Sequence, residues 1–290
     1  MYYVLLVVSI ILAVCKSSLY NSYAKRSKIT NRSLFSFNAV SYGVAAVIAL
    51  VGVLFSAQSV SLTTVICAFF YAAIVISLQT ASITAMSIGA MSTTSICVMY
   101  GMIIPAVAGP IFWKEPIGIL QIAGIVMMLA SLWLIEGRGA SRTRPTEKKW
   151  IPLAILAFIL SGMAGVMEKI HQSTEAREER LPFVLVACAF MLAFSLSVLP
   201  FTKRVAESVA YLPTLGIAAL SGLVIGFYST VNLILSGKLD SMIYYPVANG
   251  GALILTVLAS ALLFKERMDK PKIIGTAIGL AGILCLSIPV

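Results

Sequence analysis

Phe112–Glu115 (FWKE) and Phe264–Glu266 (FKE) are two copies of one short pattern, in which an aromatic side chain comes before a Lys-Glu pair. An apolar segment follows each copy, and it carries Gly124 in the first case and Gly275 in the second. The Lys-Glu pair and the glycine both recur after 151 residues, in a chain of 290 residues. Because a constant offset is the mark of an internal repeat, the sequence predicts two related halves.

The composition is that of a chain embedded in lipid. Hydrophobic residues make up 60% of the sequence and charged residues 11%, and the mean hydropathy is +0.99. A soluble domain carries about a quarter charged residues. The sequence therefore predicts an integral membrane protein, and we expect no nucleic-acid partner despite the net charge of +10.

Ten apolar segments are long enough to cross a bilayer as helices, because a spanning helix needs about 20 residues. We expect an all-α protein, since the strands of a barrel would alternate in polarity over about 10 residues. Five segments fall in each half. Their expected limits are 2–23, 33–55, 61–84, 88–112, 117–136, 150–173, 181–201, 211–236, 240–263 and 271–289.

One polar segment separates the halves. Gly137–Lys149 (GRGASRTRPTEKK) is interpreted as a solvated linker between a first five-helix repeat at residues 1–136 and a second at residues 150–290. Loops after even-numbered segments hold only Lys114, Arg177, Arg180 and Lys238, whereas fifteen of the 21 Lys and Arg residues follow odd-numbered segments. The positive-inside rule then places both termini outside the cell. With five segments per half, the second half enters the membrane upside down, as an inverted repeat around a central cavity.

The closing segment of each half begins with the Lys-Glu turn and continues with a stripe of small residues. In the second half Leu263–Arg267 (LFKER) is followed by Ile273–Leu284 (IIGTAIGLAGIL). This order resembles the drug/metabolite transporter superfamily, specifically its EamA-like branch, over nearly the whole chain. The resemblance implies ten helices as a five-plus-five repeat, with a substrate cavity lined by the first four helices of each half.

Two features depart from the family pattern. The first-half turn, Lys114-Glu115-Pro116, lacks the usual arginine, and familiar members are drawn with both termini inside. The small residues Gly275, Gly279 and Gly282 are expected to let another helix approach closely, which is how helices associate in lipid.

Ionisable side chains inside a span are costly, about 2.5–3.5 kcal/mol at the centre, and they usually face a cavity. Lys16 lies in the first segment, and Glu168 and Lys169 lie near the end of the sixth. We interpret all three as candidate substrate contacts, with Glu168 as an alternative proton-coupling group. His171, the only histidine, is interpreted as an interface residue rather than a switch.

Tyrosine and asparagine recur one helical turn apart on three segments, so that each pair shares a helix face. Amide and phenol groups of this kind can hydrogen-bond a polar substrate, or alternatively a neighbouring helix. The candidate substrate-binding residues, besides the three ionisable ones, are the pairs Asn38 and Tyr42, Tyr228 and Asn232, and Tyr245 and Asn249, together with Tyr20, Gln79 and Tyr100.

Proline and glycine mark places where a spanning helix can bend. The candidate hinge residues are Pro105, Gly222, Gly226, Pro246 and Gly250. Alternating access needs such places, although both residue types are also common in membrane helices without a gating role.

The sequence favours a secondary active transporter that exports or exchanges a small polar metabolite, anionic or zwitterionic, in the plasma membrane of a bacterium. The alternatives are a proton-coupled exporter of cationic drugs or amino acids, and a membrane channel or scaffold. An enzyme is not expected, since one histidine and two aspartates near loops offer no catalytic cluster. We expect no cofactor and no metal. The expected partners are the substrate, the bilayer, a coupling proton or counter-substrate, and a second copy of the chain as a homodimer.

Overall fold

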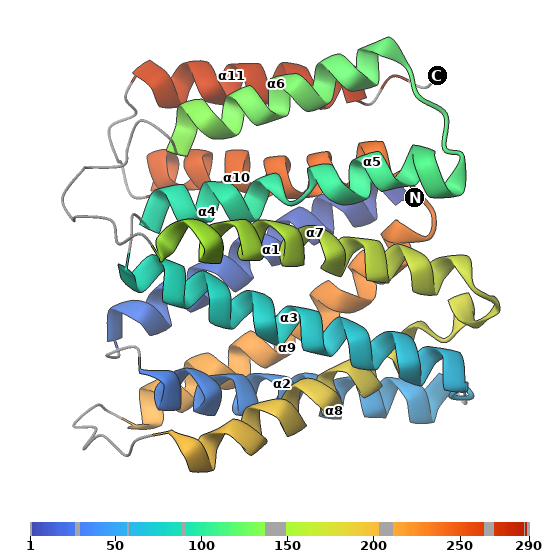
Figure 1. Cartoon of the computed structure of the whole chain (residues 1–290), viewed down its shortest axis with the longest axis vertical. Coiled ribbons are helices and arrows are strands. Elements are labelled where there is room, and N and C mark those ends of the chain that lie inside the picture. The colour runs from blue at the N-terminus through green and yellow to red at the C-terminus, as the bar shows by residue number, and fades with distance from the viewer. Residues whose placement is uncertain are drawn as a thin grey trace. The chain divides into compact units, whose positions relative to one another are not determined.

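A computed structural model describes residues 2–26, 30–56, 58–88, 91–136, 149–202, 211–263, 270–286 and 288. These residues form eleven α-helices and two short 3-10 helices, and no strand occurs among them (Figure 1). The prediction of an all-α protein is confirmed. In chain order the elements are α1 (Tyr2–Arg26), α2 (Asn31–Ser56), α3 (Leu62–Ile88), α4 (Met91–Tyr100), α5 (Ile103–Trp113), α6 (Ile119–Glu136), α7 (Trp150–Ser173), η1 (Glu175–Glu178), α8 (Arg180–Val198), η2 (Leu199–Phe201), α9 (Tyr211–Ser236), α10 (Ser241–Leu263) and α11 (Lys270–Leu286).

The expected apolar segments match the helices closely, because a helix in lipid must satisfy all its backbone hydrogen bonds internally over a fixed length. Among the described residues, six helices are long and apolar enough to span a membrane, and three shorter apolar helices accompany them. Large apolar side chains are exposed along these helices, for example Leu54, Phe55, Phe112, Ile119 and Leu284. Such exposure is the pattern of a surface that faces lipid.

The fourth expected segment, 88–112, is wrong as one continuous helix. The structure divides it into α4 and α5, with Gly101 and Met102 in a turn between them. Here the backbone hydrogen bonds join residues three apart instead of four apart. The N–H of Gly101 donates to the carbonyl of Val98 at 3.1 Å, and the N–H of Ile104 donates to the carbonyl of Gly101 at 3.0 Å. Pro105 explains the break, because it has no N–H for the carbonyl four residues earlier and its ring crowds that carbonyl.

The described chain divides into two compact units, and each is discontinuous in sequence. The first unit comprises residues 1–10, 77–169 and 238–290, and the second comprises residues 11–76 and 170–237. Three of the four divisions fall inside α1, α3 and α7, and the fourth lies between α9 and α10. Each unit is therefore assembled from both sequence halves, while the division at the 137–149 linker stays a prediction.

In the first unit α6 packs along α11, and α10 packs on α5, α6 and α11 (Figure 1). Glycine makes the α6–α11 approach possible. A Cβ added at Gly124 would lie 2.9 Å from the carbonyl oxygen of Gly282, and a Cβ at Gly282 would lie 3.1 Å from that of Gly124. A Cβ at Gly275 would meet Ile135 and the carbonyl of Ser131. The expectation that this stripe admits a neighbouring helix is confirmed, and the neighbour is α6.

In the second unit α2 packs on both α8 and α9. A Cβ at Gly222 would collide with the Ser41 carbonyl and the Val44 side chain, so α9 can lie this close to α2 only with glycine there. The Ser41 hydroxyl donates to the carbonyl of Ala218 at 2.9 Å and ties the same two helices together.

Some sequence predictions fall outside the described residues. They are residues 137–148 of the linker, the second Lys-Glu turn at residues 264–269, and the loop lysines and arginines at 28, 138, 142, 144, 148, 203, 204, 265 and 267.

Candidate functional site

Lys16 is the charged residue placed deepest along α1. It lies inside the apolar span Tyr2–Tyr20, four residues before the end of that span, which is about 6 Å at a rise of about 1.5 Å per residue. Its ammonium lies over the ring of Tyr228 on α9, 4.0 Å from the ring centroid. Among the described residues no carboxylate forms an ion pair with it. The Lys16 side chain thus lies against the negative face of a ring, a contact worth about 0.5–2 kcal/mol.

Aromatic residues from α1 and α2 gather one turn further along α1. Tyr20 and Tyr23 contact Phe37 of α2, with ring centroids 5.6 and 4.2 Å apart, and the cluster continues to Ala218 of α9. The structure therefore brings three of the predicted residues, Lys16, Tyr20 and Tyr228, to the packing of α1, α2 and α9 in the second unit.

Three further predicted residues belong to the second unit. Asn38 and Tyr42 lie on α2 and are 2% and 3% exposed, and Asn232 lies one turn beyond Tyr228 on α9 and is 7% exposed. All three take part in interactions with the protein. Amides and phenols buried in an apolar bundle fix helices or ligands through hydrogen bonds, so these residues stay candidate substrate contacts.

In the first unit, Lys169 of α7 pairs with Glu115 of the α5–α6 loop at 2.6 Å. The two side chains are 12% and 7% exposed. The other oxygen of Glu115 accepts the backbone N–H of Ser241 at 2.7 Å, and the lysine also donates to the carbonyl of Leu239 at 3.3 Å. Glu115 thus neutralises a buried lysine and caps the first turn of α10, where unpaired N–H groups favour an anion.

The conformation of the Lys-Glu turn explains how Glu115 reaches these partners. Lys114 ends α5 in the left-handed conformation, with φ 54° and ψ 34°, and it is the only described non-glycine residue with positive φ. That conformation reverses the chain after a helix. A Cβ at Gly109 would collide with the Glu115 carboxylate, so glycine leaves the space into which the side chain folds.

A second carboxyl group lies beside the pair. Burial raises the pKa of Asp240, the Glu115 carboxylate raises it further, and the Lys169 ammonium offsets part of the increase. Asp240 precedes α10, so this cluster joins the end of α7, the α5–α6 loop and the start of α10. Sequence reasoning named Lys169 but missed Glu115 and Asp240 as its neighbours.

The tyrosine hydroxyls of the first unit are engaged with the backbone. Tyr100 donates to the carbonyl of Leu129 at 2.9 Å, and Tyr245 donates to that of Gly165 at 2.5 Å. Asn249 is exposed and donates to the carbonyl of Tyr245, one turn earlier on α10, at 2.9 Å. Gln79 on α3 and the buried Glu168 on α7 also interact with the protein.

The candidate hinge residues behave differently from one another. Pro105 follows the interruption between α4 and α5, whereas α10 continues without a break through Pro246 and Gly250. Gly222 lies in α9 at a close approach to α2, whereas a Cβ at Gly226 would make an ordinary contact with Ala45, at 3.7 Å. A helix break therefore coincides with one of the five, and hinge motion stays a prediction for all of them.

A polar network in the second unit was missed by the sequence analysis. Glu179, between η1 and α8, accepts hydrogen bonds from the backbone and hydroxyl of Ser61, both at 2.8 Å, and from the hydroxyl of Thr64 at 2.6 Å. Burial raises the pKa of Glu179, but the hydrogen bonds from Thr64 and Ser61 lower it more, so the pKa lies below its ordinary value. The partners are more than 100 residues apart in sequence, and no local pattern joins them.

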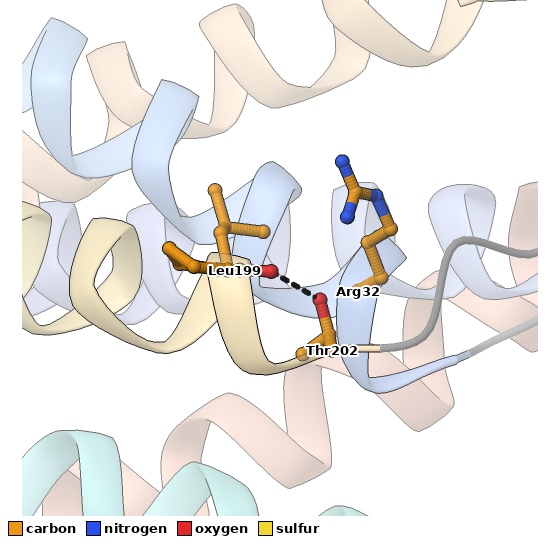
Figure 2. A pocket seen from close by; sticks show the side chains of 4 residues that line it. Arg32, Leu199 and Thr202 are labelled. Atoms are coloured by element: carbon orange, nitrogen blue, oxygen red, sulfur yellow. Dashed lines mark hydrogen bonds between the residues drawn. The ribbon is translucent and has the colours of Figure 1, made fainter.

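A pocket of about 400 Å³ lies at the end of the second unit where α2 begins. It is lined by Arg32, Leu199, Pro200 and Thr202, and the Thr202 hydroxyl donates to the Leu199 carbonyl at 2.7 Å (Figure 2). None of the predicted site residues lines it. Among the described residues, no three His, Cys, Asp or Glu side chains gather as a metal site would require.

Comparison with known proteins finds a family that is similar to the second half of the chain. Residues 148–288 match the model of the EamA-like transporter family. One solved crystal structure has a TM-score of 0.76 and 14% sequence identity, and the match covers 99% of this chain and 96% of that chain. At this identity the similarity concerns the fold alone. No curated protein sequence matches the chain. The second half of the chain is therefore similar to the EamA-like transporter family, which is a family of membrane transporters in the drug/metabolite transporter superfamily.

Proposed function

We propose that the protein is a secondary active transporter of a small anionic or zwitterionic metabolite, and that Lys16 contacts the negative group of the substrate. The observation that carries the proposal is a lysine charge inside a candidate span, held over Tyr228 rather than in an ion pair with any described carboxylate. A charged side chain inside a span costs free energy, so its presence there usually indicates a function. A substrate carboxylate or phosphate would supply the missing counter-charge.

The neighbouring tyrosines suit the remainder of such a substrate. Tyr20 and Tyr228 carry aromatic rings and hydroxyl groups, and the buried amides of Asn38 and Asn232 lie on α2 and α9 beside the cluster. A pocket that combines apolar walls with few polar groups binds one orientation of a small molecule. Metabolites with a carboxylate or phosphate on a compact organic body fit this chemistry.

The packing of counterpart helices supports alternating access by two related halves. The five-plus-five repeat pairs α2 with α8, the α4–α5 segment with α10, and α6 with α11, and each of these pairs is in direct contact within its unit. Halves related by a two-fold axis in the membrane plane bring counterparts together in this way. We propose further that both termini lie outside the plasma membrane, as the distribution of lysine and arginine indicates.

The test is uptake into liposomes that contain the purified full-length protein. The substrate panel comprises amino acids, sugar phosphates, nucleotide sugars and organic acids, each offered with and without the same compound inside. Saturable exchange of an anion or zwitterion is the expected result, whereas conductance without saturation would indicate a channel. A panel in which only organic cations move would favour the drug-exporter alternative.

Variants at the cation–π pair make the test specific. Lys16→Met should weaken anion binding about 10- to 100-fold, because a hydrogen bond to a charged group contributes about 1.5–3 kcal/mol. Lys16→Arg keeps the charge and should retain most of the uptake. Tyr228→Phe removes the hydroxyl but keeps the ring under the ammonium, whereas Tyr228→Leu removes the ring as well. Comparing the two variants separates the contribution of the hydroxyl from that of the ring. Equal loss of anion and cation uptake in Lys16→Met would contradict charge selection by this residue.

A further inference from the structure

His171, the only histidine of the chain, is fully buried in the last turn of α7. Its ring packs on Phe183 of α8, with centroids 4.4 Å apart. Nε2 lies 3.1 Å from the hydroxyl oxygen of Thr64, and Nδ1 lies 3.1 Å from the amide nitrogen of Gln172. Both ring nitrogens therefore have protein partners, and the proposed substrate site uses neither.

The orientation of Gln172 fixes the tautomer of the histidine. The amide oxygen of Gln172 accepts Nε–H of Arg180 at 3.2 Å, and its amide nitrogen donates to the carbonyl of Arg177, also at 3.2 Å. Since arginine can only donate and a carbonyl can only accept, the amide cannot be reversed. The group that faces Nδ1 is therefore an N–H donor, and Nδ1 must accept. His171 is neutral and carries its proton on Nε2.

The remaining hydrogen bonds follow in sequence from that tautomer. His171 Nε2–H donates to Thr64, and Thr64 donates its own hydroxyl proton to Glu179 at 2.6 Å. Glu179 also accepts the N–H of Ser61, the residue before α3. One directed chain thus runs from the Arg177–Arg180 segment through Gln172, His171 and Thr64 to the carboxylate that caps α3.

We propose that His171 is a proton-binding site, and that a proton bound at Nδ1 releases the α7–α8 connection from the start of α3. Adding a proton at Nδ1 would place two N–H donors 3.1 Å apart. Gln172 then has to turn its oxygen toward the ring, and it loses its bonds to both Arg177 and Arg180 at once. The ligand is a proton, so the inference adds a site to the transporter and does not depend on the proposed substrate.

The charged groups around the ring are few. From the elements packed against it, Glu179 faces it across Thr64, and Arg180 faces it across Gln172. The Arg180 guanidinium is itself paired with the exposed Glu178 at 3.0 Å, and Arg177 also approaches Glu178. On α7 itself, Lys169 is paired with Glu115, and the buried Glu168 lies one turn earlier. Glu179 is therefore the charge that stabilises a protonated ring, and Thr64 is the group that connects them.

A neighbouring glycine holds the amide in its present orientation. A Cβ at Gly237, just after α9, would lie 2.6 Å from the amide oxygen of Gln172. The amide therefore fills the space against that backbone and has little room to turn without movement of the connection. This packing is what would convert a proton on one ring into displacement of a segment.

Because the chain has one histidine, its ring can be observed directly. The experiment uses full-length protein labelled with 15N-histidine in lipid nanodiscs, with nitrogen NMR spectra recorded from about pH 4 to pH 8. Amide hydrogen exchange of residues 58–66 and 171–183 is measured at the same pH values. At neutral pH the spectrum should show the Nε2–H tautomer. As the second nitrogen becomes protonated, exchange in both segments should rise with the same midpoint.

Matched variants separate the network from general destabilisation. Thr64→Val removes the bridging hydroxyl and should raise exchange at residues 58–66 at every pH, whereas Thr63→Val, at the exposed neighbouring threonine, should leave it unchanged. Thr64→Ser should restore the wild-type behaviour. His171→Gln should abolish the pH dependence of exchange, and Gln172→Glu should keep the ring protonated at pH values where the wild-type ring is neutral. An Nδ1–H tautomer at neutral pH, or a ring that titrates while exchange in both segments stays constant, would overturn the proposal.

Discussion

The pair between Lys169 and Glu115 allows a quantitative prediction. Glu115→Gln removes the negative charge but keeps an amide oxygen for the N–H of Ser241, so the main loss is the counter-charge of a lysine that is 12% exposed. Breaking a buried ion pair by removing one partner costs about 3–5 kcal/mol. Asp240 lies close enough to influence both groups and can compensate part of the lysine charge. We therefore expect a loss at the lower end, about 3 kcal/mol.

The double variant Lys169→Met/Glu115→Gln distinguishes the pair from its separate parts. Once both charges are gone, no uncompensated charge stays buried, and the loss should fall to about 1 kcal/mol. The coupling between the two positions should then be at least about 2 kcal/mol, within the range for residues in direct contact. Glu178→Gln is the matched control, because Glu178 is 69% exposed and pairs with Arg180. An exposed pair contributes about 0–1 kcal/mol.

The assay is reversible unfolding of the full-length protein in detergent micelles with a chemical denaturant, followed by tryptophan fluorescence. Each variant is compared with the wild type through its free energy of unfolding at constant slope, so that a change in the unfolded state is recognised. If Glu115→Gln costs no more than Glu178→Gln, or if the double variant equals the sum of the single ones, the pair is not the stabilising contact that the geometry indicates.

Three more predictions rest on contrasts within the chain. Gly124→Ala should destabilise the α6–α11 contact by about 1–3 kcal/mol, because its Cβ would lie 2.7 Å from Leu286 and 2.9 Å from a backbone oxygen; Gly216→Ala, with nothing within 4 Å, should be neutral or stabilising in the same unfolding assay. The raised pKa of Asp240 means that the folded state keeps a proton which the unfolded state has released, so stability should fall as the pH rises from about 4 through the raised pKa. Asp240→Asn should remove that fall when melting temperatures are measured against pH. Glu179 has a lowered pKa, so its contribution should be lost as the pH falls below about 4.3, and Glu179→Gln should flatten the curve on that side. Melting curves that keep the wild-type pH dependence in both variants would contradict these assignments.

The helices could be predicted from the sequence almost residue by residue, for a physical reason. Each span must be about as long as the hydrocarbon layer is thick and must be apolar, and both requirements are visible in the sequence as a run of apolar residues. The break between α4 and α5 could not be predicted from the sequence, because proline interrupts some membrane helices and not others. Pro105 follows a break, whereas α10 continues through Pro246. Which outcome occurs depends on how neighbouring segments satisfy the freed carbonyl, and the local sequence does not contain that information.

The site residues could be predicted by type but not by partner. Lys16 and Lys169 could be predicted as candidates because they are charged residues in apolar segments. In the structure Lys16 lies over the ring of Tyr228, and Lys169 pairs with the carboxylate of Glu115. Glu115 was visible as part of a repeated turn, but its contacts with Ser241 span 126 residues. Glu179 appeared as one acid in a charged loop. Such pairings arise from tertiary structure, and a single sequence gives no signal for them.

The interleaved construction of the two units has a consequence for how the protein is made. Helices α4 to α6 leave the ribosome long before α10 and α11, with which they form one compact body. Until the last helices are inserted, Glu115 has no Ser241 to cap, and the glycine face of α6 has only lipid beside it. A nascent chain stopped at the linker would therefore present unfinished surfaces to membrane quality control. Separate genes for the two halves should yield stable protein only when both are expressed in the same cell.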